Sequence, residues 1–588
     1  MSALHPRLPL RPTLLCLAIS LLAGSLLAGC AGTSQQQANQ PAPEQATVAP
    51  PEPVDELPYK AFEAETFYAL LVAEFAGSAE RYDIALGNYV QEAHKTRDPG
   101  IAARATRIAR YLNARQAALN TGLLWTELEP DNQEAIFIVA TELIQSGQLV
   151  DALDYSLKLD NHSSDSLFHS IAAAAADGSE EQRQQLTTRY RMLVRDQPDN
   201  AEMKVGLALL LQQQEQLDEA LDLSRQALKQ EPELIAAAIL EARLLGQMGR
   251  PAEALKELAE MVNRHPDNPR LRLHYARLLA STDLEAAQSQ FELLLAQSPD
   301  DPELLFSLAL VCNERGDLEQ AETHFQRLLE FPSRASSAQY YLGRIAEKRS
   351  QWELALSHYL QVSPGPDFMP AMLRTTEILV RADQRDLAHQ RLQSAREKFP
   401  ADAERFYLLE AEVLRQFEFY DDAEKILSSG LQAIPDSVQM RYSRAMIYER
   451  TGRIDKLEAD LRAILAEDPD NATALNALGY TLADRTDRYE EALILIERAL
   501  QLQPDEPAIL DSLGWVHYRL GNYDEALLRL REALRAMPDP EVAAHLGEVL
   551  WATGQQEEAT LIWQQGLELQ PGSPVILRTI ERLQGSAP

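Results

Sequence analysis

Small and large apolar residues recur along most of the chain with a spacing of about 34 residues. Each copy has an Ala, an aromatic residue or Leu four positions later, an Ala or Leu three positions after that, and a Pro five positions further on. In residues 507–538 these positions are Ala526, Leu530, Ala533 and Pro538. The apolar residues within each copy follow helical spacing, which predicts a pair of amphipathic helices rather than strands.

The small residues fall where two closely packed helices require them. Helices that cross at a short distance need Gly or Ala at the contact, and Gly514 and Ala526 provide them. Gly521 permits a tight turn, and Pro538 ends the second helix because its nitrogen cannot donate a hydrogen bond. This order of residues is typical of the tetratricopeptide repeat (TPR). The sequence therefore predicts an all-α TPR α-solenoid, a right-handed superhelix of about 15 helix pairs.

The repeats predict how the chain is organised. The copies are expected to begin near Thr66, Pro99, Gln133, Leu167, Ala201, Ile235, Pro269, Pro302, Ser336, Met369, Glu404, Val438, Ala472, Pro507 and Pro540. We expect degenerate TPR-like repeats at residues 59–200 and a regular TPR superhelix at residues 201–583. A Pro-rich run at residues 363–366 is expected to shorten one second helix. Residues 363–368 then form either a joint between two halves of the superhelix or one distorted loop.

Residues 1–29 predict a lipoprotein signal peptide. Arg7 and Arg11 precede an apolar run, residues 14–28, that is too short for a comfortable membrane span. The run leads into Leu-Ala-Gly-Cys, which resembles the lipobox of bacterial lipoproteins and makes Cys30 the expected lipidation site. The alternative is an ordinary secretory signal followed by a chance cysteine.

Residues 30–58 are expected to be the lipidated cysteine and a disordered tether. They are rich in Pro, Gln and Ala and poor in large apolar residues, so they cannot bury enough surface to fold. In the lipoproteins that this signal resembles, Asp directly after the cysteine retains the protein in the inner membrane. Ala31 and Gly32 therefore imply the outer membrane. The body would be held there by acyl chains and would face the periplasm.

The charge of the chain limits its partners. The sequence has 55 Lys and Arg against 89 Asp and Glu, a formal net charge of −34. A surface this acidic repels phosphate groups, so we expect no nucleic-acid partner. Cys312 is the one cysteine of the repeat region, and its apolar neighbours predict a buried, unreactive thiol.

The sequence contains no recognisable catalytic motif. It has no phosphate-binding glycine loop, HExxH helix, paired CxxC or nucleophile elbow. The 11 histidines are scattered, and His517 and His545 lie inside well-formed repeats where packing or solvation accounts for them. We therefore expect no enzymatic activity, no metal site and no cofactor.

The expected binding surface is the concave groove, which the first helix of each pair lines through its second, fifth, ninth and twelfth residues. In the last copies this register selects Asn476, Tyr480, Asp511, Trp515, Tyr518, Glu548 and Trp551. Tyr and Trp are frequent anchors for protein ligands. Trp515 and Trp551 fit the core between repeats equally well, whereas Tyr518 is the better groove candidate.

The last repeats also carry a family resemblance. They read NALGYTLAD, ILDSLGWVHYRLGNYDEALLRLREAL and HLGEVLWATGQQEEATLIWQQGLEL within residues 476–583. Together with the lipobox and tether, this design resembles a proteobacterial family of TPR outer-membrane lipoproteins that includes the pseudomonad adaptors of the carboxyl-terminal processing protease CtpA.

The resemblance implies an adaptor with two kinds of partner. It would bind a periplasmic carboxyl-terminal processing serine protease and promote the degradation of its substrates, peptidoglycan cross-link hydrolases. The alternative is a TPR assembly factor for an outer-membrane or secretion/polysaccharide machine. Periodicity and composition alone predict only a periplasmic protein-binding scaffold.

Overall fold

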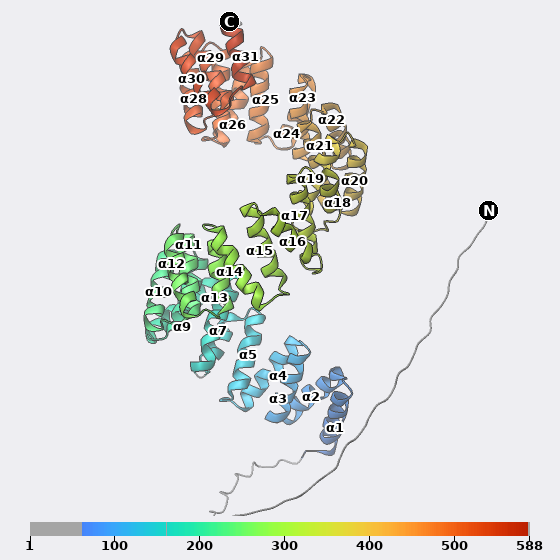
Figure 1. Ribbon diagram of the computed structural model, residues 1–588, viewed down its shortest axis with the longest axis vertical. Coiled ribbons are helices and arrows are strands. Elements are labelled where there is room, and N and C mark those ends of the chain that lie inside the picture. Colours follow the sequence, from blue (N-terminus) through green and yellow to red (C-terminus); the bar gives the residue numbers. More distant parts are fainter. Residues whose placement is uncertain (1–61, 160, 586–588) are drawn as a thin grey trace, which may run out of the picture. The chain divides into compact units, whose positions relative to one another are not determined.

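The computed structural model describes residues 62–159 and 161–585, apart from the side chains of residues 161–166. The predicted signal peptide, Cys30 and the tether lie outside these residues. The described part contains 31 α-helices and two 3-10 helices in tandem and no β-strand (Figure 1). The prediction of an all-α repeat fold is therefore confirmed. No helix of the described part is long and apolar enough to cross a membrane.

Along the sequence, fifteen first and second helices alternate and one last helix follows. Each first helix packs on the second helix after it except α7 (Asn161–Ala174), which packs mainly on α9 (Ala201–Gln213). The chain separates into two compact units, Met1–Thr96 and Arg97–Pro588. The described part of the first unit is one pair, α1 (Ala64–Ser78) and α2 (Tyr82–Thr96).

The second unit holds the other pairs and α31 (Pro574–Gln584). Its first helices are α3 (Pro99–Tyr111), α5 (Gln133–Gln145), α7 (Asn161–Ala174), α9 (Ala201–Gln213), α11 (Ile235–Gln247), α13 (Pro269–Leu279), α15 (Pro302–Arg315), α17 (Ala335–Lys348), α19 (Phe368–Arg381), α21 (Ala403–Gln416), α23 (Val438–Arg450), α25 (Ala472–Arg485), α27 (Pro507–Arg519) and α29 (Pro540–Ala552). Its second helices are α4 (Arg115–Leu128), α6 (Leu149–Ser156), α8 (Glu180–Asp196), α10 (Leu217–Gln230), α12 (Pro251–Arg264), α14 (Leu284–Gln297), α16 (Leu318–Leu328), α18 (Trp352–Tyr359), α20 (Arg385–Lys398), α22 (Tyr420–Ala433), α24 (Ile454–Glu467), α26 (Tyr489–Leu502), α28 (Tyr523–Ala536) and α30 (Gln556–Leu569). The 3-10 helices are Ala175–Asp177 and Pro400–Asp402.

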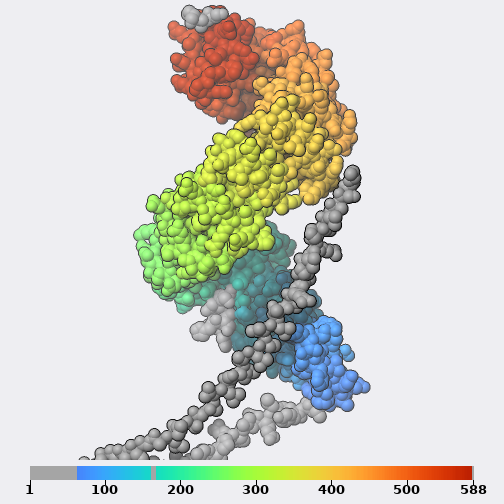
Figure 2. Space-filling view, turned by 45° about the vertical axis from the view of Figure 1, so that its right-hand side comes forward, coloured from blue at the N-terminus to red at the C-terminus, as the bar shows by residue number. Residues whose placement is uncertain are grey.

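Glycines let the two helices of a pair approach closely. A Cβ on Gly514 of α27 would lie 2.6 Å from Cγ of Leu530 on α28, so a larger residue cannot occupy this position without displacing its neighbour. Gly547 of α29 lies against the Trp563 ring of α30 in the same way. Within residues 97–585, contacts run mainly between helices that are neighbours along the chain. Neighbouring colours accordingly lie side by side along this part in Figures 1 and 2. The repeats are therefore held together by local packing.

Asparagine caps fix where several first helices begin. The side-chain oxygens of Asn200, Asn268 and Asn471 accept hydrogen bonds of 2.8–3.0 Å from the backbone N–H three residues later. Such a cap stabilises a helix by about 1 kcal/mol. The expected starts at Ala201 and Ala472 are the first residues of α9 and α25.

The fourth copy begins earlier than the sequence predicts. Helix α7 starts at Asn161, whereas the apolar pattern predicts a start near Leu167. The intervening residues, Asn-His-Ser-Ser-Asp-Ser, are polar, so the first turn lacks the apolar spacing on which the prediction rests.

The Pro-rich run does shorten a second helix. Helix α18 ends at Tyr359 after 8 residues, whereas α20 and α22 each have 14. The chain then forms a loop that contains two prolines and enters α19 at Phe368. Val362 in this loop is buried in one apolar cluster with Ala346 and Ile378, so the core continues through the loop.

Cys312 is fully buried on α15, as its apolar neighbours predict. Burial, together with the nearby carboxylates of Asp317 and Glu292, raises the pKa of its thiol to about 11. The thiolate, which is the reactive form, is therefore scarce at neutral pH.

Candidate functional site

The seven predicted groove residues lie on three successive first helices. Asn476 and Tyr480 are on α25, Asp511, Trp515 and Tyr518 on α27, and Glu548 and Trp551 on α29. Helix α27 packs against both α25 and α29, which brings their side chains together across the repeat boundaries. They form two neighbouring clusters of aromatic and charged groups.

Asp511 and His545 form a buried ion pair between α27 and α29. Nδ1 of His545 lies 3.0 Å from both carboxylate oxygens of Asp511. The two side chains are 10% and 8% exposed. Burial alone would lower the pKa of the imidazole, but the carboxylate of Asp511, aided by Glu541 and Asp484, raises it to about 9. His545 is therefore protonated at neutral pH and donates this hydrogen bond to Asp511.

Trp515 and Tyr480 enclose the imidazole. The indole of Trp515 stacks on it, with 4.3 Å between the ring centroids and 26° between the planes. The hydroxyl oxygen of Tyr480 lies 3.4 Å from Nε2 of His545 and 3.3 Å from Oε1 of Glu541. The protonated Nε2 donates to the tyrosine oxygen, and the tyrosine hydroxyl donates to Glu541. Burial and the nearby carboxylates raise the pKa of Tyr480, so its hydroxyl keeps its proton.

A pocket of about 580 Å³ opens beside this cluster. Its lining includes Tyr442, Glu449, Asn476, Tyr480, Asp511 and Glu541, and no Lys or Arg. Burial raises the pKa of Glu449. Oδ1 of Asn476 is buried and has no hydrogen-bond partner among the described residues. The pocket therefore offers carboxylates and an unused acceptor oxygen to a ligand that is positively charged or donates hydrogen bonds.

The second cluster lies around Glu548. The hydroxyl of Tyr518 donates a hydrogen bond of 3.4 Å to Oε1 of Glu548, and Arg582 of α31 forms an ion pair with the same carboxylate. Trp551 is half-buried, with its ring 5.7 Å from that of Trp563. Tyr518 is also half-buried, so both side chains retain some accessible surface.

Trp515 differs from these aromatic residues because it is only 5% exposed. It belongs to the apolar core shared with residues such as Leu478 and Leu513. Its Nε1 is buried without a hydrogen-bond partner among the described residues. Trp515 therefore shapes the cluster from within the core rather than lining the pocket itself.

Two charged members of the clusters were missed by the sequence reasoning. The sequence predicts only packing or solvation for His545, and no motif singles out Arg582. Each lies 34 residues from its partner, Asp511 and Glu548 respectively. Opposite charges separated by one repeat period are a signal that could have found both pairs.

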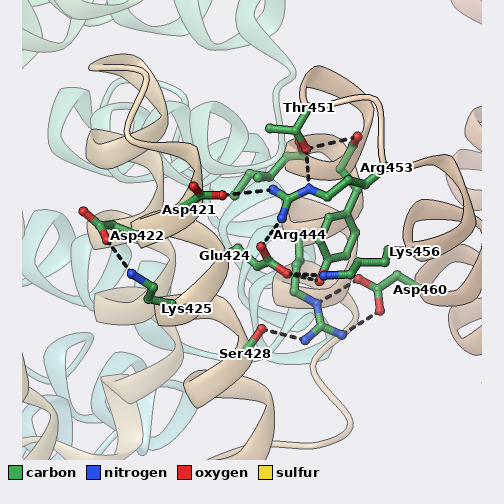
Figure 3. Close-up of polar contacts among 12 residues, drawn as sticks. Asp421, Asp422, Glu424, Lys425, Ser428, Arg444, Thr451, Arg453, Lys456 and Asp460 are labelled. Atoms are coloured by element: carbon green, nitrogen blue, oxygen red, sulfur yellow. Dashed lines mark hydrogen bonds and ion pairs between the residues drawn. The ribbon is translucent and has the colours of Figure 1, made fainter.

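A separate polar network joins α22, α23 and α24 (Figure 3). Nε and Nη2 of Arg444 donate to the two oxygens of Asp460 at 2.8 and 2.7 Å, and Nη1 donates to Ser428 at 2.9 Å. Glu424 accepts hydrogen bonds from three further residues, Tyr448, Arg453 and Lys456. Apart from Nη2 of Arg453, which lies 3.6 Å from Oδ1 of Asp421 without a hydrogen bond, these groups satisfy one another. We therefore interpret the network as a link between repeats and not as a ligand site.

Across residues 62–159 and 161–585, no group of three or more His, Cys, Asp or Glu is placed to hold a metal ion. The pocket beside Tyr480 combines negative charge with aromatic surface, a combination suited to part of a protein partner.

Comparisons with known proteins agree with the helix pairs. Models of the tetratricopeptide repeat match residues 211–278, 277–335, 314–367, 470–539 and 512–574. The TPR repeat-containing protein PA4667 of Pseudomonas aeruginosa is 43% identical over 529 residues, which cover 90% of this chain and 90% of that protein. Bacteriophage adsorption protein A of Escherichia coli is 34% identical over 87 residues, 15% of this chain and 9% of that protein.

Among solved structures, a chain of the APC/C hetero-tetramer Cut9–Hcn1 aligns with this protein at 14% identity and a TM-score of 0.31. The alignment covers 88% of this chain and 96% of that chain. The family itself rests on the repeat models and on the Pseudomonas relative. TPR repeats are protein-interaction scaffolds, and this chain belongs to the tetratricopeptide repeat family together with that Pseudomonas aeruginosa protein.

Proposed function

We propose that this protein is a non-enzymatic scaffold that holds partner proteins on its first helices. The observation that carries the proposal is the pocket beside Tyr480, where carboxylates, tyrosine rings and the buried acceptor of Asn476 converge. These groups suit an extended, basic or hydrogen-bond-donating segment of a protein. The net charge of −34 disfavours nucleic acid and other polyanions.

We place the protein at the outer membrane, anchored by lipid and facing the periplasm. The support is the sequence that leads to Cys30 and the absence of Asp at the position after it. Acyl chains contribute about 0.8 kcal/mol for each buried methylene, enough for stable attachment when several chains act together.

The partners that we propose are a periplasmic carboxyl-terminal processing protease and its peptidoglycan hydrolase substrates. The support is the resemblance to the lipoprotein adaptor family together with the relative of the same repeat design in Pseudomonas aeruginosa. A scaffold without catalytic groups accelerates proteolysis by raising the local concentration of substrate or by favouring the active state of the protease.

Purification from the cell envelope tests these partners. We expect the protease and at least one hydrolase to co-purify with the chain. Co-purification of an outer-membrane barrel or secretin in their place would favour the alternative, an assembly factor for an outer-membrane or secretion/polysaccharide machine.

Reconstitution tests the mechanism. The purified chain alone should cleave nothing, and its addition to the protease should speed degradation of the hydrolase. The double variant Glu449→Gln, Asn476→Ala should bind the client more weakly, whereas Glu557→Gln, which removes one exposed carboxylate outside the pocket, should not. An unchanged protease rate would contradict the adaptor role. Unchanged binding by the double variant would contradict the assignment to this pocket.

A further inference from the structure

The shortened helix α18 borders a second pocket, of about 610 Å³. Helix α18 is about six residues shorter than α20, which corresponds to about 9 Å of helix. The space lies between α18, the loop that contains Pro364, the start of α19, and α20. It is therefore a direct consequence of the proline-rich interruption in the repeat pattern.

The walls of this α18–α20 pocket are largely apolar. They include Leu356, Leu360, Phe368, Met372, Leu387 and Phe399. Leu360 is 43% exposed and Leu387 is 50% exposed. Large, solvent-exposed apolar side chains that line a cavity indicate a binding site for a ligand that covers them.

The charge of the pocket is opposite to that of the protein. Arg391 and Lys398 line it, and no Asp or Glu does. Nε of Arg391 is buried without a hydrogen-bond partner, and neither cation has an ion pair within the described part of the chain. On the same helix, Arg396 donates to Glu410 at 2.5 Å. Arg272 and Arg519 are also half-buried and lack a carboxylate, but both donate hydrogen bonds to other groups. Arg391 donates none to another described residue, so its half-buried guanidinium is available to an external anion.

The pocket face of α20 carries its groups in one stripe. Gln390 and Arg391 lie three and four residues after Leu387, Ser394 lies four and three residues after them, and Lys398 lies four residues after Ser394. Gln390 and Ser394 form no hydrogen bonds with other described residues. The stripe therefore offers an apolar contact, two cations and two uncharged polar groups side by side.

We propose that the α18–α20 pocket binds a segment of a partner protein in which a large apolar side chain lies next to a carboxylate. The apolar side chain covers Leu360 and Leu387, and the carboxylate pairs with Arg391. Gln390 and Ser394 then bind the backbone of the segment, a role that they would not have with a fatty acid. This inference rests on the proposed scaffold function and adds the chemistry of one docking site, on second helices rather than first helices.

Fluorescence anisotropy with the full chain tests this site. The probe is a fluorescein-labelled, amidated peptide, Gly-Ser-Asp-Leu-Phe-Glu-Ser-Gly. One comparison peptide replaces Asp and Glu by Asn and Gln, and another replaces Leu and Phe by Ala. Arg391→Met should weaken binding of the acidic apolar peptide about tenfold, because it removes a charge-assisted hydrogen bond and keeps an apolar stem. Arg535→Met removes one exposed arginine outside the pocket and should leave binding unchanged.

The outcomes separate clearly. The proposal is supported if both comparison peptides bind more weakly than the acidic apolar peptide and if Arg391→Met, but not Arg535→Met, weakens binding of that peptide. Peptide binding that Arg391→Met does not change, or no binding at all, would overturn it. Palmitate that binds in an Arg391-dependent manner while the peptide does not would assign the pocket to a fatty acid. Failure here leaves protease acceleration intact, whereas failure of the scaffold function abolishes acceleration whatever the peptide does.

Discussion

His545 and Asp511 pair across a repeat boundary, with Nδ1 of the imidazole 3.0 Å from each carboxylate oxygen and Trp515 stacked on the ring. The pair joins α27 to α29, which are also linked by the hydrogen bond from Tyr518 to Glu548. A buried charge is costly unless it is paired, so each residue depends on the other.

The pair should make stability depend on pH. The pKa of His545 is about 9 in the folded protein and about 6.5 in an unfolded chain. The contribution of protonated His545 to the stability of the fold is therefore complete below a pH of about 6.5. It is lost as the pH rises through about 9. We expect the free energy of unfolding to fall by up to about 3 kcal/mol over this range. Urea denaturation measures this pH dependence in the wild type and in the double variant Asp511→Asn, His545→Gln. If the free energy of unfolding varies with pH in the same way in both proteins, the ion pair is not its cause.

Trp515 and Tyr480 should respond differently to substitution. Trp515→Ala removes a buried aromatic ring and should cost about 3–5 kcal/mol of stability. Tyr480→Phe keeps the ring and removes the hydroxyl that reaches Glu541, so it should change client binding more than melting. Thermal melting and client affinity, measured on both variants, distinguish a structural role from a ligand-binding role for each residue. A stable Trp515→Ala protein with weakened client binding would instead make Trp515 a direct ligand contact.

Arg444 should be important to the link between α23 and α24. Arg444→Met leaves the carboxylate of Asp460, which is only 8% exposed, without its two hydrogen bonds. We expect a loss of about 3 kcal/mol in the free energy of unfolding. Adding Asp460→Asn should restore part of it, because no unpaired charge then remains. If the double variant is as unstable as the sum of the single ones, the two residues are not coupled.

Two glycines in helices make a matched comparison. Gly547→Ala would place its Cβ 2.1 Å from the indole nitrogen of Trp563, which should cost about 1–3 kcal/mol. Gly246→Ala has no atom within 4 Å of the added Cβ and should be neutral or stabilise helix α11 by up to about 1 kcal/mol. Thermal denaturation compares them directly. Equal melting temperatures would show that the α29–α30 contact is loosely packed.

Cys30→Ala tests the proposed anchor. The variant should leave the outer-membrane fraction while its repeat region keeps its circular dichroism spectrum and melting temperature. Fractionation with a salt wash measures the attachment. A variant that remains with the membrane after the wash would require an anchor other than lipid on Cys30.

The sequence predicts the helix pairs well because their pattern is local. The spacing of apolar residues and the caps before Ala201 and Ala472 depend only on residues within a few turns. The polar first turn at Asn161 hides its helix for the same reason. The shortening of α18 follows from prolines in the sequence, whereas the pocket that it borders depends on how three helices pack.

The site was harder to predict because it depends on contacts between repeats. The helical register places the seven groove positions on α25, α27 and α29 but does not determine how far each side chain is buried. Trp515 is enclosed, whereas Trp551 and Tyr518 keep some exposed surface. The role of His545 becomes visible only once Asp511 is brought against it from the preceding repeat.

The local packing of the repeats has a consequence for how the protein opens. The apolar interior is divided into several clusters, each built from successive repeats. The repeats of each cluster can unfold locally as one cooperative unit and exchange their amide protons separately from the rest. Folding can accordingly begin in any of these units. A partner that contacts two of these clusters couples their local unfolding. Binding of the partner should therefore slow amide hydrogen exchange even in repeats that it does not contact.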